Sequence, residues 1–198
     1  IGIYSWELFT MYGVESIIRV GSAGAYSPDL ALFDLLLATG AYSESSYART
    51  QNGHSGDNIR PAPVLNERLR QSAAARGKTL REGLVHSSDV FYRSQLPGMP
   101  YWHRLRDERG CLAVEMESFA LFHNAAVTGK KAACLLTISD SFVTPAVTLP
   151  AQPEKGFTDM KEVALRAVCL GDHDGDSGNN VGQASSGLPA SPPLSPFR

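Results

Sequence analysis

Val114-Glu115-Met116-Glu117-Ser118 and Thr137-Ile138-Ser139-Asp140 each place acidic residues at the edge of an apolar run. The first segment follows the strand-like Leu112-Ala113-Val114 and opens an apolar helix, and the second ends an apolar strand over 132–138. A strand, a helix and a strand in this order are typical of an α/β fold with a central sheet that is largely parallel or mixed. Ligands of such sheets bind at the carboxyl ends of the strands, so these carboxylates are candidates for ligand chemistry.

Apolar periodicity predicts the other elements outward from these two segments. We expect a helix that ends near Gly13, helices over 63–76, 116–127 and 157–170, and strands over 16–20, 33–41, 79–86 and 131–138. Residues 42–63 are polar, with Gly, Asn and Pro, and are predicted to form a loop. The pattern predicts one α/β domain over 1–170, its sheet flanked by helices. Residues 171–198 are rich in Gly, Ser, Asp and Pro with few large apolar residues, which is typical of a disordered tail.

Bulk composition excludes several classes of function. The 198 residues are 43% hydrophobic, enough for one sizeable core, and carry a formal net charge of -2. No basic run marks a surface for nucleic acid or an anionic membrane. The longest apolar runs are far shorter than the roughly 20 residues of a membrane-spanning helix. The three cysteines and five histidines show no paired spacing, so we expect no disulfide framework, no metal site and a reducing cytoplasm.

The segment Arg19-Val20-Gly21-Ser22-Ala23-Gly24-Ala25 puts a guanidinium before a run of small residues. If 21–24 form a turn at the end of a strand, their backbone N–H groups and the Ser22 hydroxyl can bind an anion. Arg19 then adds a forked cation suited to phosphate. The alternative is a tight turn beside a salt-bridged arginine, and the residues alone leave both interpretations open.

The other polar segments also allow two interpretations each. Glu117 is placed to accept hydrogen bonds from ribose hydroxyls, with the Met116 thioether against the sugar, or simply to favour a helix N-terminus. Asp140 is a candidate proton donor or the first residue of a turn. In Ser87-Ser88-Asp89-Val90-Phe91-Tyr92, Phe91 is a candidate for packing on a flat base or for the core, and Tyr92 is interpreted as structural.

Taken in order, these four segments resemble the hexameric, bacterial-type purine nucleoside phosphorylases, and the resemblance runs from Ile1 to about Leu170. It implies phosphorolysis of purine (deoxy)ribonucleosides to free base and (deoxy)ribose 1-phosphate, a reaction of purine salvage. Inorganic phosphate is then the co-substrate, and no cofactor or metal is implied. The resemblance also implies a homo-oligomer, a hexamer built from dimers, in which a neighbouring subunit completes each site.

The same resemblance implies roles for the matching residues. It gives phosphate binding to Arg19, Ser22 and Gly21, ribose binding to Met116 and Glu117, and proton donation to purine N7 to Asp140. The residues it places around the base are Ala23, Gly24, Ser88, Phe91, Val114, Glu115 and Ser139.

Two departures from the family pattern lower the activity that we expect. The chain begins at Ile1 without the family's N-terminal part, which carries a phosphate loop and residues that reach neighbouring subunits, so an N-terminally truncated protein is expected. The arginine that the family places beyond its catalytic acid falls at Pro153, with Lys155 nearby, and a lysine does not reproduce a bidentate arginine. We therefore expect weak or absent turnover.

Other functions stay open at this point. A methylthioadenosine or adenosylhomocysteine nucleosidase resembles the same pattern but attacks with water, whereas Arg19 with Ser22 favours phosphate. A truncated, non-catalytic chain that binds nucleoside would keep the base and ribose residues. Uridine phosphorylase is a further relative, but its pyrimidine-reading Gln and Arg side chains are not found here. The sequence does not separate 6-oxo from 6-amino purines.

Overall fold

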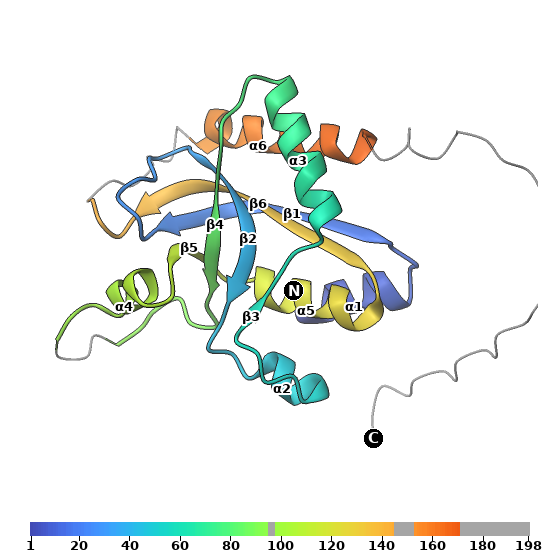
Figure 1. Cartoon of the computed structure of the whole chain (residues 1–198), viewed down its shortest axis with the longest axis horizontal. Coiled ribbons are helices and arrows are strands. Elements are labelled where there is room, and N and C mark those ends of the chain that lie inside the picture. The colour runs from blue at the N-terminus through green and yellow to red at the C-terminus, as the bar shows by residue number, and fades with distance from the viewer. Residues whose placement is uncertain (95–97, 145–152, 171–198) are drawn as a thin grey trace, which may run out of the picture.

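The computed structural model describes residues 1–94, 98–144 and 153–170, and Figure 1 shows the elements around one sheet. The helices are α1 (Gly2–Thr10), α2 (Tyr47–Asn52), α3 (Pro63–Ala75), α4 (Tyr101–Asp107), α5 (Ser118–Thr128) and α6 (Pro153–Cys169). The strands are β1 (Ser16–Ala25), β2 (Leu35–Tyr42), β3 (Asn58–Ile59), β4 (Leu80–Ser87), β5 (Cys111–Glu115) and β6 (Lys131–Ser141). The predicted α/β fold with a mixed sheet flanked by helices is confirmed.

The sheet closes on itself. Its strand order is β3-β2-β4-β5-β1-β6, and an additional pairing of β2 with β6 closes β2, β4, β5, β1 and β6 into a ring, to which β3 is attached through β2. Strands β2, β4 and β5 run in one direction, and β1 and β6 run in the other. The two longest ladders, β1 with β6 and β2 with β4, are both parallel.

Two helical layers cover the sheet, as Figure 1 shows, with α3 and α6 on one side and α1 and α5 on the other. Side chains alternate across a strand, so neighbouring leucines of β2 serve different cores. Leu35 and Leu37 pack with the core of α3 and α6, whereas Leu36 packs with the core of α1 and α5. Continuous apolar runs such as 35–38 therefore mark strands that are buried on both faces.

Several local expectations were wrong. Strand β1 does not stop at Gly21 but continues to Ala25, because residues 16–25 pair with β6 along their whole length. Strand β6 likewise continues past Ile138 to Ser141. The segment 42–63, predicted as loop, contains α2 and β3, and α4 was not predicted.

None of the helices within the described ranges combines the length and the apolar character that crossing a membrane requires. The described part ends at Leu170, so the disordered tail predicted over 171–198 lies outside the described residues. The domain boundary at residue 170 stays a prediction.

Candidate active site

Arg19 forms the centre of a mostly buried charge cluster beneath α5. It lies within β1, its side chain is 14% exposed, and its guanidinium is ion-paired with Glu117. Its Nε lies 3.6 Å from Glu115 Oε2, and its Nη1 lies 3.8 Å from Cys134 Sγ. A Cβ on Gly21 would lie 2.3 Å from Nη1, so the glycine leaves the space that the guanidinium occupies over the strand.

Glu115 holds the start of α5 against Arg19. It ends β5, its side chain is 1% exposed, and its carboxylate accepts hydrogen bonds from the backbone N–H groups of Glu117 and Ser118 and from the Ser118 hydroxyl. Burial raises the pKa of Glu115, and the Arg19 charge and the Ser118 hydrogen bonds oppose that rise. Both carboxylate oxygens are thus engaged inside the protein, at a residue that the resemblance places beside the base.

Glu117 and Met116 are the more accessible members of this cluster. Glu117 is the N-cap residue of α5, its side chain is 37% exposed, and its Oε2 accepts the Met116 N–H at 3.0 Å. Met116 is 39% exposed. The residue predicted to bind phosphate, Arg19, and the residue predicted to bind ribose, Glu117, are therefore in direct contact.

Asp140 lies on a bulge of β6 beside Gly24. The β1–β6 register passes from Ala23 opposite Ile138 to Gly24 opposite Asp140, which leaves Ser139 as the extra residue. Such bulges re-aim side chains next to active sites. The Ser139 hydroxyl donates to Asp140 Oδ1 at 2.7 Å and approaches the Ala23 carbonyl oxygen at 3.4 Å. Asp140 thus lies within β6 and is held by Ser139. It is not the first residue of a turn, which was the alternative interpretation of the sequence.

Gly24 joins the two predicted halves of the site. It pairs with Val114 of β5 on one side and with Asp140 of β6 on the other. A Cβ at this position would lie 2.9 Å from Asp140 Oδ2 and 2.8 Å from Phe142 Cε2. The absent side chain therefore leaves the space in which the carboxylate and the Phe142 ring lie.

We expect the substitution Gly24→Ala to lower turnover of the reaction proposed below by about 100-fold, because an Asp140 displacement of about 1 Å is enough for such a loss. Initial rates measure the effect. Gly40→Ala in β2 is the matched control, since its Cβ would also be crowded, at 2.9 Å from Asn58 Oδ1. We expect Gly40→Ala and Gly24→Ala to lose similar amounts of stability, and Gly40→Ala to keep its turnover. Equal turnover of both variants would contradict the placement of Asp140.

The Gly21–Gly24 segment is not the turn that the sequence predicted. Ser22 and Ala23 pair with Thr137 and Ile138 in the parallel ladder, and Ser22 is exposed. Extended backbone replaces the turn because β6 supplies a continuous ladder partner. The predicted turn was therefore wrong, whereas anion binding by Arg19, Ser22 and the backbone of this segment stays a prediction.

Ser88 and Phe91 belong to a segment that follows β4. Ser88 is buried, and its N–H donates to the Glu115 carbonyl oxygen at 2.8 Å, which ties this segment to the end of β5. Phe91 is 73% exposed and packs edge-to-face with Tyr92 at 4.9 Å between ring centroids. Tyr92, interpreted as structural, is 89% exposed and so does not pack in the core of the described residues.

Two adjoining cavities lie beside these residues and share Ser45 and Asp89. The smaller, of about 190 Å³, includes Ser87, Met116 and Phe119 in its lining. The larger, of about 570 Å³, is lined by Glu44, Ser45, Asp89, Val90, Tyr92, Arg93 and Ser94. Within the described ranges, no group of three or more His, Cys, Asp or Glu side chains is placed to hold a metal ion.

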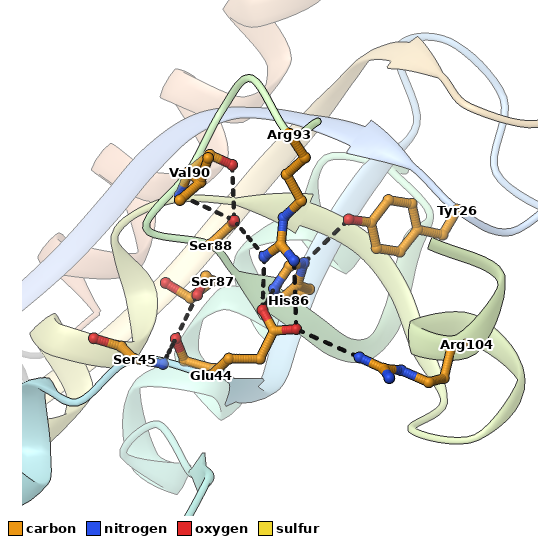
Figure 2. Close-up of polar contacts among 10 residues, drawn as sticks. Tyr26, Glu44, Ser45, His86, Ser87, Ser88, Val90, Arg93 and Arg104 are labelled. Atoms are coloured by element: carbon orange, nitrogen blue, oxygen red, sulfur yellow. Dashed lines mark hydrogen bonds and ion pairs between the residues drawn. The ribbon is translucent and has the colours of Figure 1, made fainter. Parts of the chain in front are cut away.

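Sequence reasoning missed the polar cluster of Tyr26, Glu44, His86 and Arg93, which Figure 2 shows beside Ser88. His86 Nδ1 lies 3.0 Å from the Tyr26 hydroxyl, and its Nε2 lies 3.2 Å from Glu44 Oε2. These residues come from four separate segments without a shared motif, so no local sequence pattern predicts their contact.

The closed mixed sheet and the carboxylate–guanidinium site at its centre are those of a nucleoside phosphorylase-like fold. Residues 3–169 match the sequence profile of the Phosphorylase superfamily, and the chain belongs to this family. A structure of a futalosine hydrolase mutant of Helicobacter pylori shares the fold, with a TM-score of 0.72 and 22% identity, over 85% of this chain and 74% of that one.

Curated relatives in several bacteria are more similar in sequence. Purine nucleoside phosphorylase DeoD-type of Mycoplasma genitalium is 40% identical over 167 residues, which are 83% of this chain and 68% of the relative. The DeoD-type enzyme of Clostridium beijerinckii is 37% identical over 171 residues, 85% of this chain and 69% of the relative. The chain thus spans a little over two thirds of the length of these relatives, and the predicted resemblance to purine nucleoside phosphorylases is confirmed.

Proposed function

We propose that this protein is a purine nucleoside phosphorylase, a pentosyltransferase that converts a purine (deoxy)ribonucleoside and phosphate into the free base and (deoxy)ribose 1-phosphate. The observation that carries the proposal is the contact of Arg19 with Glu117, in a chain whose curated relatives at 35–40% identity are DeoD-type purine nucleoside phosphorylases. This contact brings a cation suited to phosphate beside a carboxylate suited to ribose hydroxyls.

In this proposal, Arg19 holds phosphate beneath the sugar, with Ser22 as a further donor and Gly21 leaving space for the guanidinium. Glu117 accepts hydrogen bonds from the ribose hydroxyls, and Met116 packs against the sugar. Glu117 is ion-paired with Arg19 in the free protein, and we propose that ribose binding draws the carboxylate toward the sugar hydroxyls. Arg19 then offers more of its donors to phosphate, whose charge stabilises the oxocarbenium-like ribose before attack on the anomeric carbon.

Asp140 protonates N7 of the purine in this scheme, which makes the base a better leaving group. Ser139 and Gly24 lie directly beside this carboxylate, and Ala23 and Val114 are proposed to border the base from β1 and β5. Ser88 and Phe91 are proposed to approach the base from the segment after β4, and Glu115 to border it while supporting Arg19. Neither a cofactor nor a metal ion is part of the proposed reaction.

The two catalytic alternatives differ in the nucleophile. A nucleosidase would release free ribose with water as the nucleophile, and the likeness to the futalosine hydrolase structure concerns the fold alone. We propose phosphate because Arg19 places a forked cation next to the proposed ribose carboxylate. Pro153 and Lys155, at which an arginine of the family pattern was expected, have side chains outside the described residues, so the expectation of weak turnover stays a prediction.

Product analysis tests the proposal. The full chain is incubated with inosine, adenosine or uridine in the presence of phosphate, and the sugar product is identified by phosphorus NMR for ribose 1-phosphate and by carbon NMR for free ribose. We expect ribose 1-phosphate and free base from a purine nucleoside, with little product from uridine. Free ribose as the sugar product would support the nucleosidase instead, and nucleoside binding without any product would support the non-catalytic alternative.

We further propose, from the resemblance, a role in purine salvage in the cytoplasm and a dimer-based hexamer with sites completed across subunit interfaces. Sedimentation of the full chain measures the oligomeric state. A monomer at micromolar concentration would contradict this part of the proposal.

A further inference from the structure

Residues 88–94 form a segment that is exposed at its centre and that two contacts hold in place. Val90, Phe91 and Tyr92 are 49%, 73% and 89% exposed, so this stretch buries little apolar surface that could fix its position. The first anchor is the hydrogen bond from the Ser88 N–H to the Glu115 carbonyl oxygen. The second is Arg93, whose Nη2 also donates to Ser88 Oγ at 3.1 Å and so closes the segment on itself.

Arg93 is held in turn by Glu44, which follows β2. The shortest Arg93–Glu44 contact is 2.6 Å, between Nη2 and Oε2, and the two side chains are 24% and 34% exposed. The guanidinium also lies 4.6 Å from the centroid of the Tyr101 ring, a cation–π contact with α4. Arg104 approaches the other oxygen of Glu44 at 4.0 Å from a 65% exposed position.

The buried His86 side chain contacts Glu44 and supports its carboxylate. The imidazole is fully buried in β4, and both of its ring nitrogens have partners, Tyr26 and Glu44. Burial lowers the pKa of His86, which favours the neutral ring, while the Glu44 charge opposes this shift. A carboxylate only accepts hydrogen bonds, so Nε2–H donates to Glu44 and the Tyr26 O–H donates to Nδ1. Figure 2 shows this chain of contacts from Tyr26 through Glu44 to Arg93.

We infer that Glu44 is a positioning residue. Through its contacts with His86 and Arg93 it holds residues 88–94, which include Ser88 and Phe91, at the nucleoside site. The inference rests on the function proposed above. It assigns a role to Glu44, Arg93 and His86, which do not match any residue implied by the family resemblance. Glu44 and Arg93 also line the larger cavity, together with Asp89, Val90, Tyr92 and Ser94 of the same segment.

The effect of losing the pair follows from the fraction of molecules in which the segment is correctly placed. If that fraction falls tenfold, the apparent affinity for nucleoside falls by the same factor. The chemistry and the phosphate subsite at Arg19 stay intact. Glu44→Gln and Arg93→Gln are therefore expected to raise KM for nucleoside by about tenfold, with kcat and KM for phosphate within about twofold of the unsubstituted chain.

Arg104→Gln is the matched control, because it removes a cation from the same carboxylate without touching residues 88–94. We expect its kinetic constants to stay within about twofold of the unsubstituted chain. The double variant Glu44→Gln/Arg93→Gln should lose no more than either single variant, since both substitutions break one contact. Additive losses, or an equal effect of Arg104→Gln, would overturn the inference.

Amide hydrogen exchange of the full chain tests the positioning role without relying on turnover. Glu44→Gln should speed exchange in residues 88–94 by about tenfold while α3 and β6 stay unchanged, and Arg104→Gln should change neither. Unchanged exchange in 88–94 overturns the inference, whatever the kinetics show. Failure of the unsubstituted chain to convert any purine nucleoside overturns the proposed function instead, and the exchange comparison still decides the role of Glu44.

Discussion

Replacing Asp140 by asparagine is expected to lower kcat for a purine nucleoside by about two to four orders of magnitude, the usual contribution of a general acid. Asparagine has nearly the same shape and keeps a partner for the Ser139 hydroxyl, but it has no carboxyl proton to give. Nucleoside binding should therefore stay within a few-fold of the original. Initial rates with excess substrate and calorimetric binding measure the two quantities separately.

A nucleoside methylated at N7 provides the sharpest control for Asp140. Its base already carries a positive charge and leaves without protonation, so Asp140→Asn should cleave it nearly as fast as the unsubstituted chain does. Asp107→Asn on α4 serves as the surface control, because that carboxylate is exposed and paired with Arg106. If Asp140→Asn slows the methylated and the ordinary nucleoside equally, Asp140 is not the proton donor.

Replacing Arg19 by methionine is expected to lower the free energy of unfolding by about 3 kcal/mol and to raise KM for phosphate by about 100-fold or more. Glu115 is almost fully buried and would lose the charge 3.6 Å away, which leaves a carboxylate without a cation. Phosphate would lose the forked donor proposed to bind it. Denaturant unfolding and phosphate saturation curves measure the two effects.

The two consequences of losing Arg19 can be separated with a second substitution. Arg19→Met/Glu115→Gln should recover part of the stability, since the buried charge is gone, but none of the phosphate affinity. Arg81→Met is the surface control: its Nε lies 3.6 Å from Asp34 Oδ2, its side chain is 53% exposed, and its loss should cost about 1 kcal/mol or less. Recovery of phosphate affinity in the double variant would contradict the role of Arg19.

The sequence predicted the fold class and the order of most elements, because long apolar runs and glycine stops are local signals. It did not predict that β1 passes straight through Gly21–Gly24. That backbone is extended because it pairs with β6, and the partner strand is more than a hundred residues away along the chain. Small residues look like a turn in sequence, but here they leave space for Arg19 and Asp140.

The arrangement of the predicted site residues differs from the one that the sequence implied. The rule that ligands gather at the carboxyl ends of parallel strands implied one shared edge, yet β1 and β6 run against β4 and β5. Arg19 therefore acts from within a strand, and Glu117 comes to it from the start of α5. The Glu44–His86–Arg93 cluster could not be predicted because its members become neighbours only through the parallel pairing of β2 with β4.

The initial rate of base release from inosine, followed as phosphate is raised from zero to saturation, tests the central claim most directly. Our account predicts a rate that is close to zero without phosphate, rises to saturation with it, and matches the formation of ribose 1-phosphate mole for mole. A rate that is the same with and without phosphate, with free ribose as the product, would contradict the assignment of this site to phosphorolysis.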